Sequence, residues 1–470
     1  MKKFFVKSLL FLGIVAAFIA AADLSGLFKA DQKNNHDKAA WDGFYEFTED
    51  NEVDVLMIGN SHLYTGINPN HLSCLLGANC YILASPGVSV IDNYYALKEA
   101  LSRCHPSMVV LETYSIGNRK VREFKDGDLS DEYKSFSSRR NIFRKLASTP
   151  VLFSPDHYLS AWSTSVRNHD FLFRDPGQIK ANRNKTNAAF KKKDLELGRF
   201  IRFTSGITEK TDSLYDVLGP VVDGNKFRVN RENYSAVKKI QALCRKKEIP
   251  LVYLTIPMYH KHVTNYSSWK TIVSRVLGQD ARWLDLQSPY DGELFGRDCF
   301  EDTRKENQHT TARGARICDY KFVDFLVKDA RISIPDRHES EGWKKLFYGQ
   351  DGYFEMFPFD KEDRSALLLC ENVDLAGQLY IKDCILQPDE TGATLYMKVD
   401  RRVDPALISH GVEMSLELTM EGKKGYYRGF VRQVPGADPP GHYLLMGHFK
   451  MSGITGAELL SIGVVGLSED

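Results

Sequence analysis

The most constraining feature of the chain is a strand-to-helix turn in residues 53–66, which read VDVLMIGNSHLYTG. The apolar run ends at Gly59 and polar side chains follow at once, a pattern typical of a buried strand that leads through a tight turn into a helix. Such a turn lifts the Ser61 hydroxyl above the carboxyl edge of a sheet and points backbone N–H groups of the helix toward it. The segment indicates a presented nucleophile, although it also fits an ordinary loop in which Ser61 only caps the helix.

A second segment, residues 306–315, supplies the partners that a serine nucleophile needs. It reads ENQHTTARGA and places His309 immediately before a predicted helix, three residues after Glu306. A serine hydroxyl is a weak nucleophile until a base takes its proton, and a histidine does this well only when a carboxylate holds its tautomer. We predict Ser61 as the nucleophile, His309 as the general base and Glu306 as the orienting acid. Asp302 is the alternative acid if the loop folds back.

These two segments resemble the first and last sequence blocks of the SGNH (GDSL-like) hydrolase superfamily, and the resemblance covers roughly residues 50–330. More closely, the chain is similar to the envelope branch of that superfamily, which includes the alginate O-acetylation proteins and the teichoic-acid D-alanylation protein. Residues 81–98 between the two blocks have the strand, glycine turn and helix of the family's second block. The resemblance implies an oxyanion hole made by the backbone N–H groups of Gly87 and Ser61.

The chain departs from the family pattern at three places. Asn60 stands where the family has Asp, which keeps a short polar side chain beside the nucleophile. The family's third block, Gly-x-Asn-Asp, is missing after the strand at 108–111, where Glu112-Thr113-Tyr114 follows instead. The carboxylate before the histidine is Glu306 rather than Asp.

Polar side chains beside these blocks are candidates to line the pocket. They are Asn60, His62, Tyr64, Glu112, Tyr114 and His260. His62, Tyr64 and Tyr114 fit equally well as a satisfied histidine and structural aromatics packed in the core. His260 belongs to a His-x-His pair, which can bind a metal, but no third ligand lies nearby and a loop is the favoured interpretation.

We expect neither a metal nor any other cofactor. The eight cysteines form no Cys-x-x-Cys pair, which argues against a zinc site and against a redox motif. Most of them lie in apolar strand or helix patterns, where buried free thiols are the usual interpretation even in an exported protein.

Short apolar runs alternate with amphipathic helical patterns along most of the chain. The predicted strands are 53–58, 80–84, 107–112, 250–257 and 282–286, and the predicted helices are 90–103, 232–247, 267–277 and 311–328. This alternation predicts an α/β fold, a doubly wound parallel sheet with helices on both faces. Ligands of such sheets bind at the carboxyl ends of the strands, where Ser61 and His309 both fall.

The chain of 470 residues is long enough for two domains. We predict a signal peptide or membrane anchor at 1–22, a helical lead-in at 23–50, a catalytic domain at 51–335 and a β-domain at 340–470. The N-terminus has a basic flank, an apolar run from Leu9 to Ala22 and an Ala-x-Ala ending, as secretory signals do. Residues 4–22 would instead anchor the protein in the inner membrane if they are retained. Either outcome predicts an exported protein, periplasmic or in the cell envelope.

Two further regions differ in composition from the alternating pattern. Residues 117–230 form a polar stretch rich in Lys and Arg, which fits a solvated helical insertion or a basic lid that grips an anionic polymer. Seven short alternating segments after residue 340, separated by Gly, Pro and Asp, predict an all-β sandwich. This sandwich could bind carbohydrate or serve a purely structural purpose.

The functional prediction is a serine-dependent acyl-transfer enzyme of the cell envelope that acts on O-acyl groups, most simply O-acetyl groups, of a polysaccharide or glycan. A net charge of +1 and the lack of interleaved basic and aromatic residues argue against nucleic acid as a partner. Hydrolysis and transfer share the same acyl-enzyme, so the pattern leaves both open. Two alternatives are a small-ester hydrolase and a catalytically silent glycan-binding or assembly protein.

Overall fold

The structure is a computed structural model of the whole chain. It describes residues 2–28, 36–117, 130–183, 197–198, 206–292, 294–303, 309–326, 330, 332–338, 340–347, 367–375, 379–388, 393–399, 412–420, 423–433, 443–449 and 454–464. Glu306 lies outside these residues.

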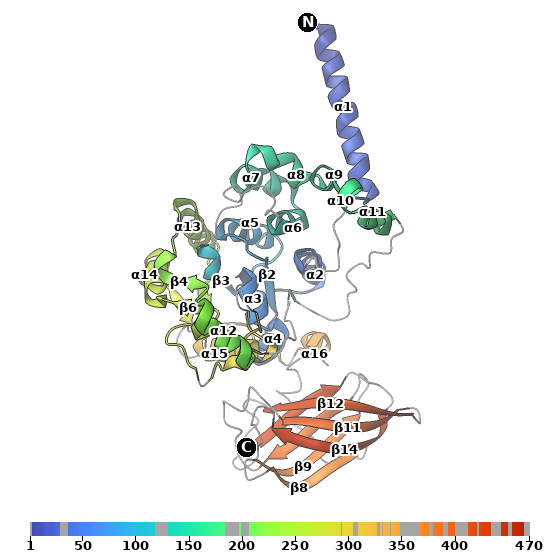
Figure 1. Cartoon of the computed structure of the whole chain (residues 1–470), viewed down its shortest axis with the longest axis vertical. Coiled ribbons are helices and arrows are strands. Elements are labelled where there is room, and N and C mark those ends of the chain that lie inside the picture. Colours follow the sequence, from blue (N-terminus) through green and yellow to red (C-terminus); the bar gives the residue numbers. More distant parts are fainter. Residues whose placement is uncertain are drawn as a thin grey trace.

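A five-stranded parallel sheet forms the centre of the α/β domain (Figure 1). Its strands are β1 (Val55–Gly59), β2 (Cys80–Ala84), β3 (Met108–Glu112), β5 (Leu251–Thr255) and β7 (Arg282–Asp285). They lie in the order β2-β1-β3-β5-β7, so the chain leaves β1 for one side of the sheet and continues with β3 on the other. The predicted α/β fold and its five strands are confirmed. Ligands of open parallel sheets bind where the strand order reverses, which here is the end of β1.

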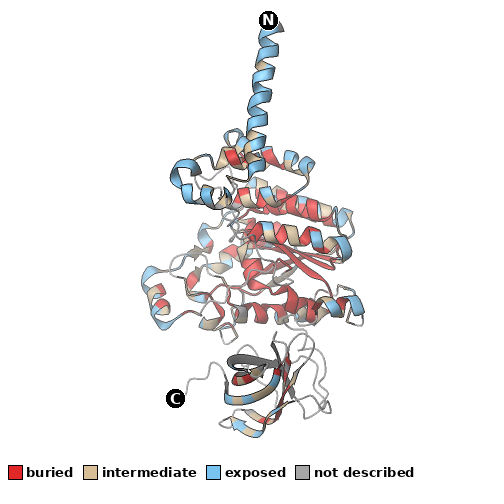
Figure 2. Cartoon of the chain, turned by 90° about the vertical axis from the view of Figure 1, so that its right-hand side faces the viewer, coloured by how far each residue is buried: buried red, intermediate tan, exposed pale blue. Residues whose placement is uncertain are grey.

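Helices cover both faces of this sheet because alternate strand residues point to opposite sides. Leu56 and Ile58 of β1 belong to one apolar core, and Val55 and Met57 belong to the other. The first core includes side chains of α2 (His36–Asp50), α5 (Val90–Ala100), α13 (Arg231–Lys246) and α14 (Tyr266–Leu277). The second includes side chains of α3 (Ser61–Gly66), α4 (Pro69–Leu76) and α15 (Ala312–Phe325). Figure 2 shows the buried residues concentrated in these layers.

A series of short helices separates β3 from α13, in the region of the predicted insertion. It comprises α6 (Ser130–Ser138), α7 (Ile142–Leu152), α8 (Tyr158–Trp162), α9 (Thr164–Arg167), α10 (Phe171–Arg174), α11 (Pro176–Arg183) and α12 (Glu209–Leu218). The minor elements are β4 (Val222–Asp223) and β6 (Val263–Thr264), with 3-10 turns at Tyr114–Ile116, Pro155–His157, Gly224–Lys226, His260–His262 and Arg297–Cys299. Helices α7 to α11 lie together at one end of the domain (Figure 1).

The N-terminal helix α1 (Lys2–Ser25) extends outward from that same end (Figures 1 and 2). Within the described part of the chain, α1 is the one helix long and apolar enough to cross a membrane, and none of it is buried in the protein. This agrees with the predicted N-terminal signal sequence or anchor.

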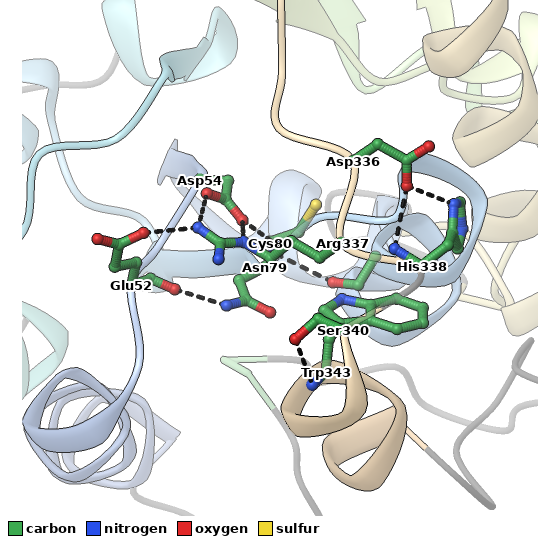
Figure 3. A network of polar contacts seen from close by, with 10 residues as sticks. Glu52, Asp54, Asn79, Cys80, Asp336, Arg337, His338, Ser340 and Trp343 are labelled. Atoms are coloured by element: carbon green, nitrogen blue, oxygen red, sulfur yellow. Dashed lines mark hydrogen bonds and ion pairs between the residues drawn. The ribbon is translucent and has the colours of Figure 1, made fainter.

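Arg337 holds the segment after α15 against the amino end of the sheet (Figure 3). The Arg337 guanidinium donates to both carboxylate oxygens of Asp54, each at 2.7 Å, and to Glu52 at 2.7 Å. Such a two-point Arg–carboxylate contact fixes geometry as well as adding energy. The helix that follows, α16 (Glu341–Phe347), buries Trp343 and Phe347 in the first core.

Seven antiparallel strands make up the C-terminal domain. They are β8 (Leu367–Leu375), β9 (Leu379–Pro388), β10 (Ala393–Val399), β11 (Val412–Met420), β12 (Lys423–Gln433), β13 (Tyr443–Phe449) and β14 (Ile454–Val464). The predicted all-β domain is confirmed. The strands follow one hydrogen-bonded order, β14-β11-β12-β13-β10-β9-β8, and only two residue pairs join β12 to β13. The two halves share an apolar core, with Leu395 and Met397 on one side and Leu416 and Leu418 on the other.

The end of β1 has no room for a side chain larger than hydrogen. A Cβ on Gly59 would lie 2.5 Å from the Cβ of Glu112 and 3.1 Å from that of Leu63. We predict that Gly59→Ala lowers the free energy of unfolding by about 1–3 kcal/mol through overpacking. The measurement is the midpoint of thermal unfolding. Gly342→Ala in α16 is the control, because its new Cβ would meet nothing closer than 3.8 Å, and equal effects of the two substitutions would contradict the prediction.

Candidate active site

Ser61 begins α3, directly after the turn that ends β1. Asn60 is the N-cap residue, and its side-chain oxygen accepts the backbone N–H of His62 at 3.0 Å. Asn60, and not Ser61, therefore caps the helix. This leaves the Ser61 hydroxyl available for another partner.

His309 provides that partner, since its Nε2 lies 2.9 Å from the Ser61 Oγ. The backbone on both sides of His309 is fixed. Thr310 donates its hydroxyl to the carbonyl of Thr65 in α3 at 2.8 Å, and Thr311 caps α15 by accepting the N–H of Gly314. The predicted pair of Ser61 and His309, 248 residues apart in the chain, is thus brought into hydrogen-bond contact.

The carboxylate on the other ring nitrogen of His309 is Glu301. Its Oε2 lies 3.2 Å from His309 Nδ1, and the side chain is almost completely buried. The backbone makes this pairing, because the Glu301 N–H donates to the His309 carbonyl at 2.7 Å and Phe300 bridges Thr310 in antiparallel fashion. The predicted alternative, Asp302, instead accepts the hydroxyl of Thr208 at 3.3 Å. The sequence pattern did not single out Glu301, which precedes His309 by eight residues.

Glu112, a predicted pocket residue, lies at the end of β3 beside the turn of Gly59 and Asn60. Its carboxyl accepts the backbone N–H groups of Tyr114 at 2.5 Å and Ser115 at 3.3 Å, and also that of Asn60. The side chain is completely buried. Burial raises the pKa of Glu112 to about 8, and the three N–H donors lower it only in part. Glu112 thus joins the turn before Ser61 to the turn after β3.

The ring of His62 lies near the rings of both His309 and Tyr114. The His62 ring centroid is 5.4 Å from that of His309 and 4.6 Å from that of Tyr114. Burial lowers the pKa of His62 well below its usual value, and the nearby His309 and His262 lower it further. His62 therefore stays a neutral imidazole. Within the described part of the chain, His62 Nδ1 and the Tyr114 hydroxyl are buried polar atoms without a hydrogen-bond partner.

Of the remaining predicted residues, Gly87 lies on the same sheet edge as Ser61, whereas Tyr64 and His260 contact other aromatic rings. Gly87 follows β2 with a left-handed φ of +60°, and β2 is the neighbour of β1, with Ala84 paired to Gly59. Gly87 is therefore on the sheet edge that carries Ser61. Tyr64 points to α2, where its ring lies 4.4 Å from that of His36. His260 is exposed and contacts the ring of Tyr259 at 4.3 Å.

Among the residues that the structure describes, no group of three or more His, Cys, Asp or Glu side chains could hold a metal ion. All eight cysteines are free thiols, and most of them are buried. The chemistry available at the site is that of a serine hydroxyl, an imidazole and a carboxylate in sequence.

Comparison with protein-family models gave no match to the chain, and comparison with curated proteins gave none either. Two solved structures show a distant likeness. A two-domain esterase active on acetylated mannans, co-crystallised with mannopentaose, aligns over 91% of this chain and 94% of its own, with a TM-score of 0.28 and 8% identity. The gut microbial diltiazem-metabolizing enzyme BT4096 aligns over 80% of this chain and 70% of its own, with a TM-score of 0.26 and 8% identity.

The buried Glu112 carboxyl predicts a pH-dependent component of stability. Its folded pKa of about 8 exceeds the usual 4.5, so the folded chain keeps a proton that the unfolded chain releases between these values. The stability of the wild type therefore falls as pH rises through this window, by at most about 1.4 kcal/mol per pH unit. Glu112→Gln removes this component. The midpoint of thermal unfolding is measured for both proteins from pH 5 to 9. The midpoint of the variant minus that of the wild type should increase with pH up to about pH 8. A difference that stays constant over this range would contradict the assignment.

Proposed function

We propose that the protein is a serine-dependent esterase or O-acyltransferase that works through an acyl-enzyme on Ser61. The observation that carries the proposal is the continuous hydrogen-bonded sequence from Ser61 Oγ to His309 Nε2, at 2.9 Å, and from His309 Nδ1 to Glu301 at 3.2 Å. Nucleophile, base and orienting acid in hydrogen-bond contact are the arrangement that serine acyl-transfer chemistry requires.

The proposed reaction has two halves. Ser61 Oγ attacks the acyl carbonyl while His309 takes its proton, and the Glu301 carboxylate stabilises the imidazolium that forms. The backbone N–H groups of Ser61 and Gly87 hold the oxyanion of the tetrahedral intermediate. The imidazolium then protonates the leaving alcohol, and an acyl-enzyme remains. In the second half, His309 removes a proton from water or from a sugar hydroxyl, which attacks the acyl group. The imidazolium then returns this proton to Ser61 Oγ as the bond between Ser61 and the acyl group breaks.

The proposed substrate is an O-acyl group, most simply O-acetyl, on a polysaccharide or glycan of the cell envelope. The apolar helix α1 supports an exported location, because signal sequences and anchors have this composition. We assign His62 and Tyr114 to the pocket, because the His62 ring lies near both the His309 and the Tyr114 ring, and each of the two residues carries a buried polar atom without a partner in the described structure. A buried polar group left unpaired costs stability, and such a cost is typical of a functional site.

We predict that exposure to a chromogenic acetyl ester acetylates or turns over wild-type protein but not Ser61→Ala. The substitution removes the only atom that the proposal allows to carry the acyl group. Mass spectrometry of the intact protein detects the adduct, and absorbance detects the released chromophore. Added oligosaccharides would then separate transfer from hydrolysis.

The control for this experiment is the circular dichroism of both proteins, which establishes that each is folded. Turnover by folded Ser61→Ala would contradict the proposed nucleophile. Silence from both proteins, together with equal oligosaccharide binding, would favour a glycan-binding or assembly protein.

A second prediction concerns the triad acid. Glu301→Gln keeps the size of the side chain but cannot hold His309 in the required tautomer, so we expect kcat to fall by about 10²- to 10⁴-fold. Asp302→Asn should leave kcat within a few-fold of the wild type, because its carboxylate contacts Thr208 instead. Glu306→Gln completes the series, and a large loss confined to that variant would assign the acid to Glu306.

A further inference from the structure

Helix α1 is attached to the helices of the insertion by specific polar contacts at its C-terminal end. The Asp23 carboxylate accepts the backbone N–H of Ser165 at 2.6 Å and the hydroxyl of Thr164 at 2.9 Å, at the start of α9. The carbonyls of Leu27 and Phe28, just after the helix, accept the side-chain amides of Asn182 at 2.7 Å and Asn168 at 2.8 Å. The position of α1 on the domain is therefore defined where the apolar run ends.

The helices at this end of the domain (Figure 1) expose large apolar side chains, which together we call the apolar patch. Its members lie on α7, α8 and α10 and are Ile142, Phe143, Leu146, Leu159, Trp162, Leu172 and Phe173. They are seven of the thirteen exposed large apolar side chains found outside α1 among the described residues. Phe143 and Phe173 are 83% and 86% exposed. Water-facing phenylalanines gathered on one region mark an interaction surface.

The charges near the apolar patch suit a lipid surface. Residues 141–183 contain six Lys or Arg and three Asp, whereas the whole chain is nearly neutral. Arg144 and Lys145 follow Phe143 in α7, and Arg174 follows Phe173 in α10. Arg144 also donates to the Glu99 carbonyl, Lys145 lies over the Phe136 ring, and Arg174 pairs with Asp170. Short helices with exposed Phe, Leu and Trp on one side and basic residues around them bind the interface of an anionic bilayer.

We propose that the apolar patch rests on the bilayer in which a retained α1 is inserted, so that α7, α8 and α10 form a membrane-contacting platform. The position of α1 at the same end of the domain identifies the bilayer as the partner that covers the patch. A helix of 24 residues is about 36 Å long and spans the hydrocarbon core of about 30 Å. The patch lies at the end of the domain from which α1 extends (Figures 1 and 2), so a bilayer around α1 reaches the patch as well. This inference goes beyond the proposed acyl transfer and does not depend on it.

The test uses the full chain, with α1 present by intact mass, reconstituted in vesicles of phosphatidylcholine and phosphatidylglycerol. An environment-sensitive fluorophore is attached to Phe143→Cys or to Phe173→Cys, with the partly exposed Cys104 and Cys370 replaced by Ser. Val217→Cys in α12 is the matched control, since it is apolar, 82% exposed and outside the patch. We expect a blue shift and quenching by headgroup-level nitroxide lipids at 143 and 173, and neither at 217.

Two outcomes would overturn the proposal. Equal emission and equal quenching at all three sites would mean that the patch faces water. A blue shift at 143 and 173 without quenching by nitroxide lipids would mean that protein covers the patch, for example a second copy of the chain. Because the readout is a spectrum and not turnover, failure of the platform is distinguishable from failure of the proposed chemistry.

A second variant keeps the test independent of any one label. Phe143→Asp and Phe173→Asp together place two charges in the patch while α1 and its contacts through Asp23 remain. A fluorophore at Leu146→Cys should lose its blue shift and its lipid quenching in this background, and circular dichroism checks that the helices persist. Unchanged quenching would contradict the inference.

Discussion

The burial of β1 on both faces is the constraint on which the site depends. All five residues of β1 are buried, and the strand pairs with β2 on one side and with β3 on the other. Its last residue, Gly59, presses against Glu112, so the turn before Ser61 has little room to move. The Ser61 side chain is therefore positioned by the packing of the sheet rather than by a loop. Sites supported by rigid elements hold catalytic geometry better than sites on loops.

The two neighbouring histidines, His309 and His62, differ in their hydrogen-bond partners. His309 is in hydrogen-bond contact with both Ser61 and Glu301. His62, 5.4 Å away, is buried without a carboxylate and has a strongly lowered pKa. The mechanism that we propose therefore assigns the general base to His309 and not to His62. The same low pKa leaves His62 able to act only as a neutral hydrogen-bonding group.

The sheet and two residues of the site could be predicted from the sequence because their signals are local. Ser61 and His309 each lie where a strong pattern changes, one at the end of an apolar strand and one just before a helix. Glu301 could not be found in this way, because its approach to His309 depends on antiparallel backbone pairing across a loop without hydrophobic periodicity. The contact of Arg337 with Asp54 could not be predicted either, because the two residues are 283 positions apart and no local pattern connects them.

A buried ion pair and backbone hydrogen bonds join helices of the insertion to α5, which packs on the sheet that carries Ser61. The Arg139 guanidinium after α6 contacts the Asp92 carboxylate of α5 at 2.6 Å, with both side chains almost completely buried. Glu99, further along α5, accepts the backbone N–H groups of Arg140 and Asn141 at the start of α7. Breaking a buried pair by removing one partner costs about 3–5 kcal/mol, so the Arg139–Asp92 contact is a substantial link between the end of α6 and α5. A bilayer that orients α7 would therefore also orient α5, the sheet and the Ser61 edge.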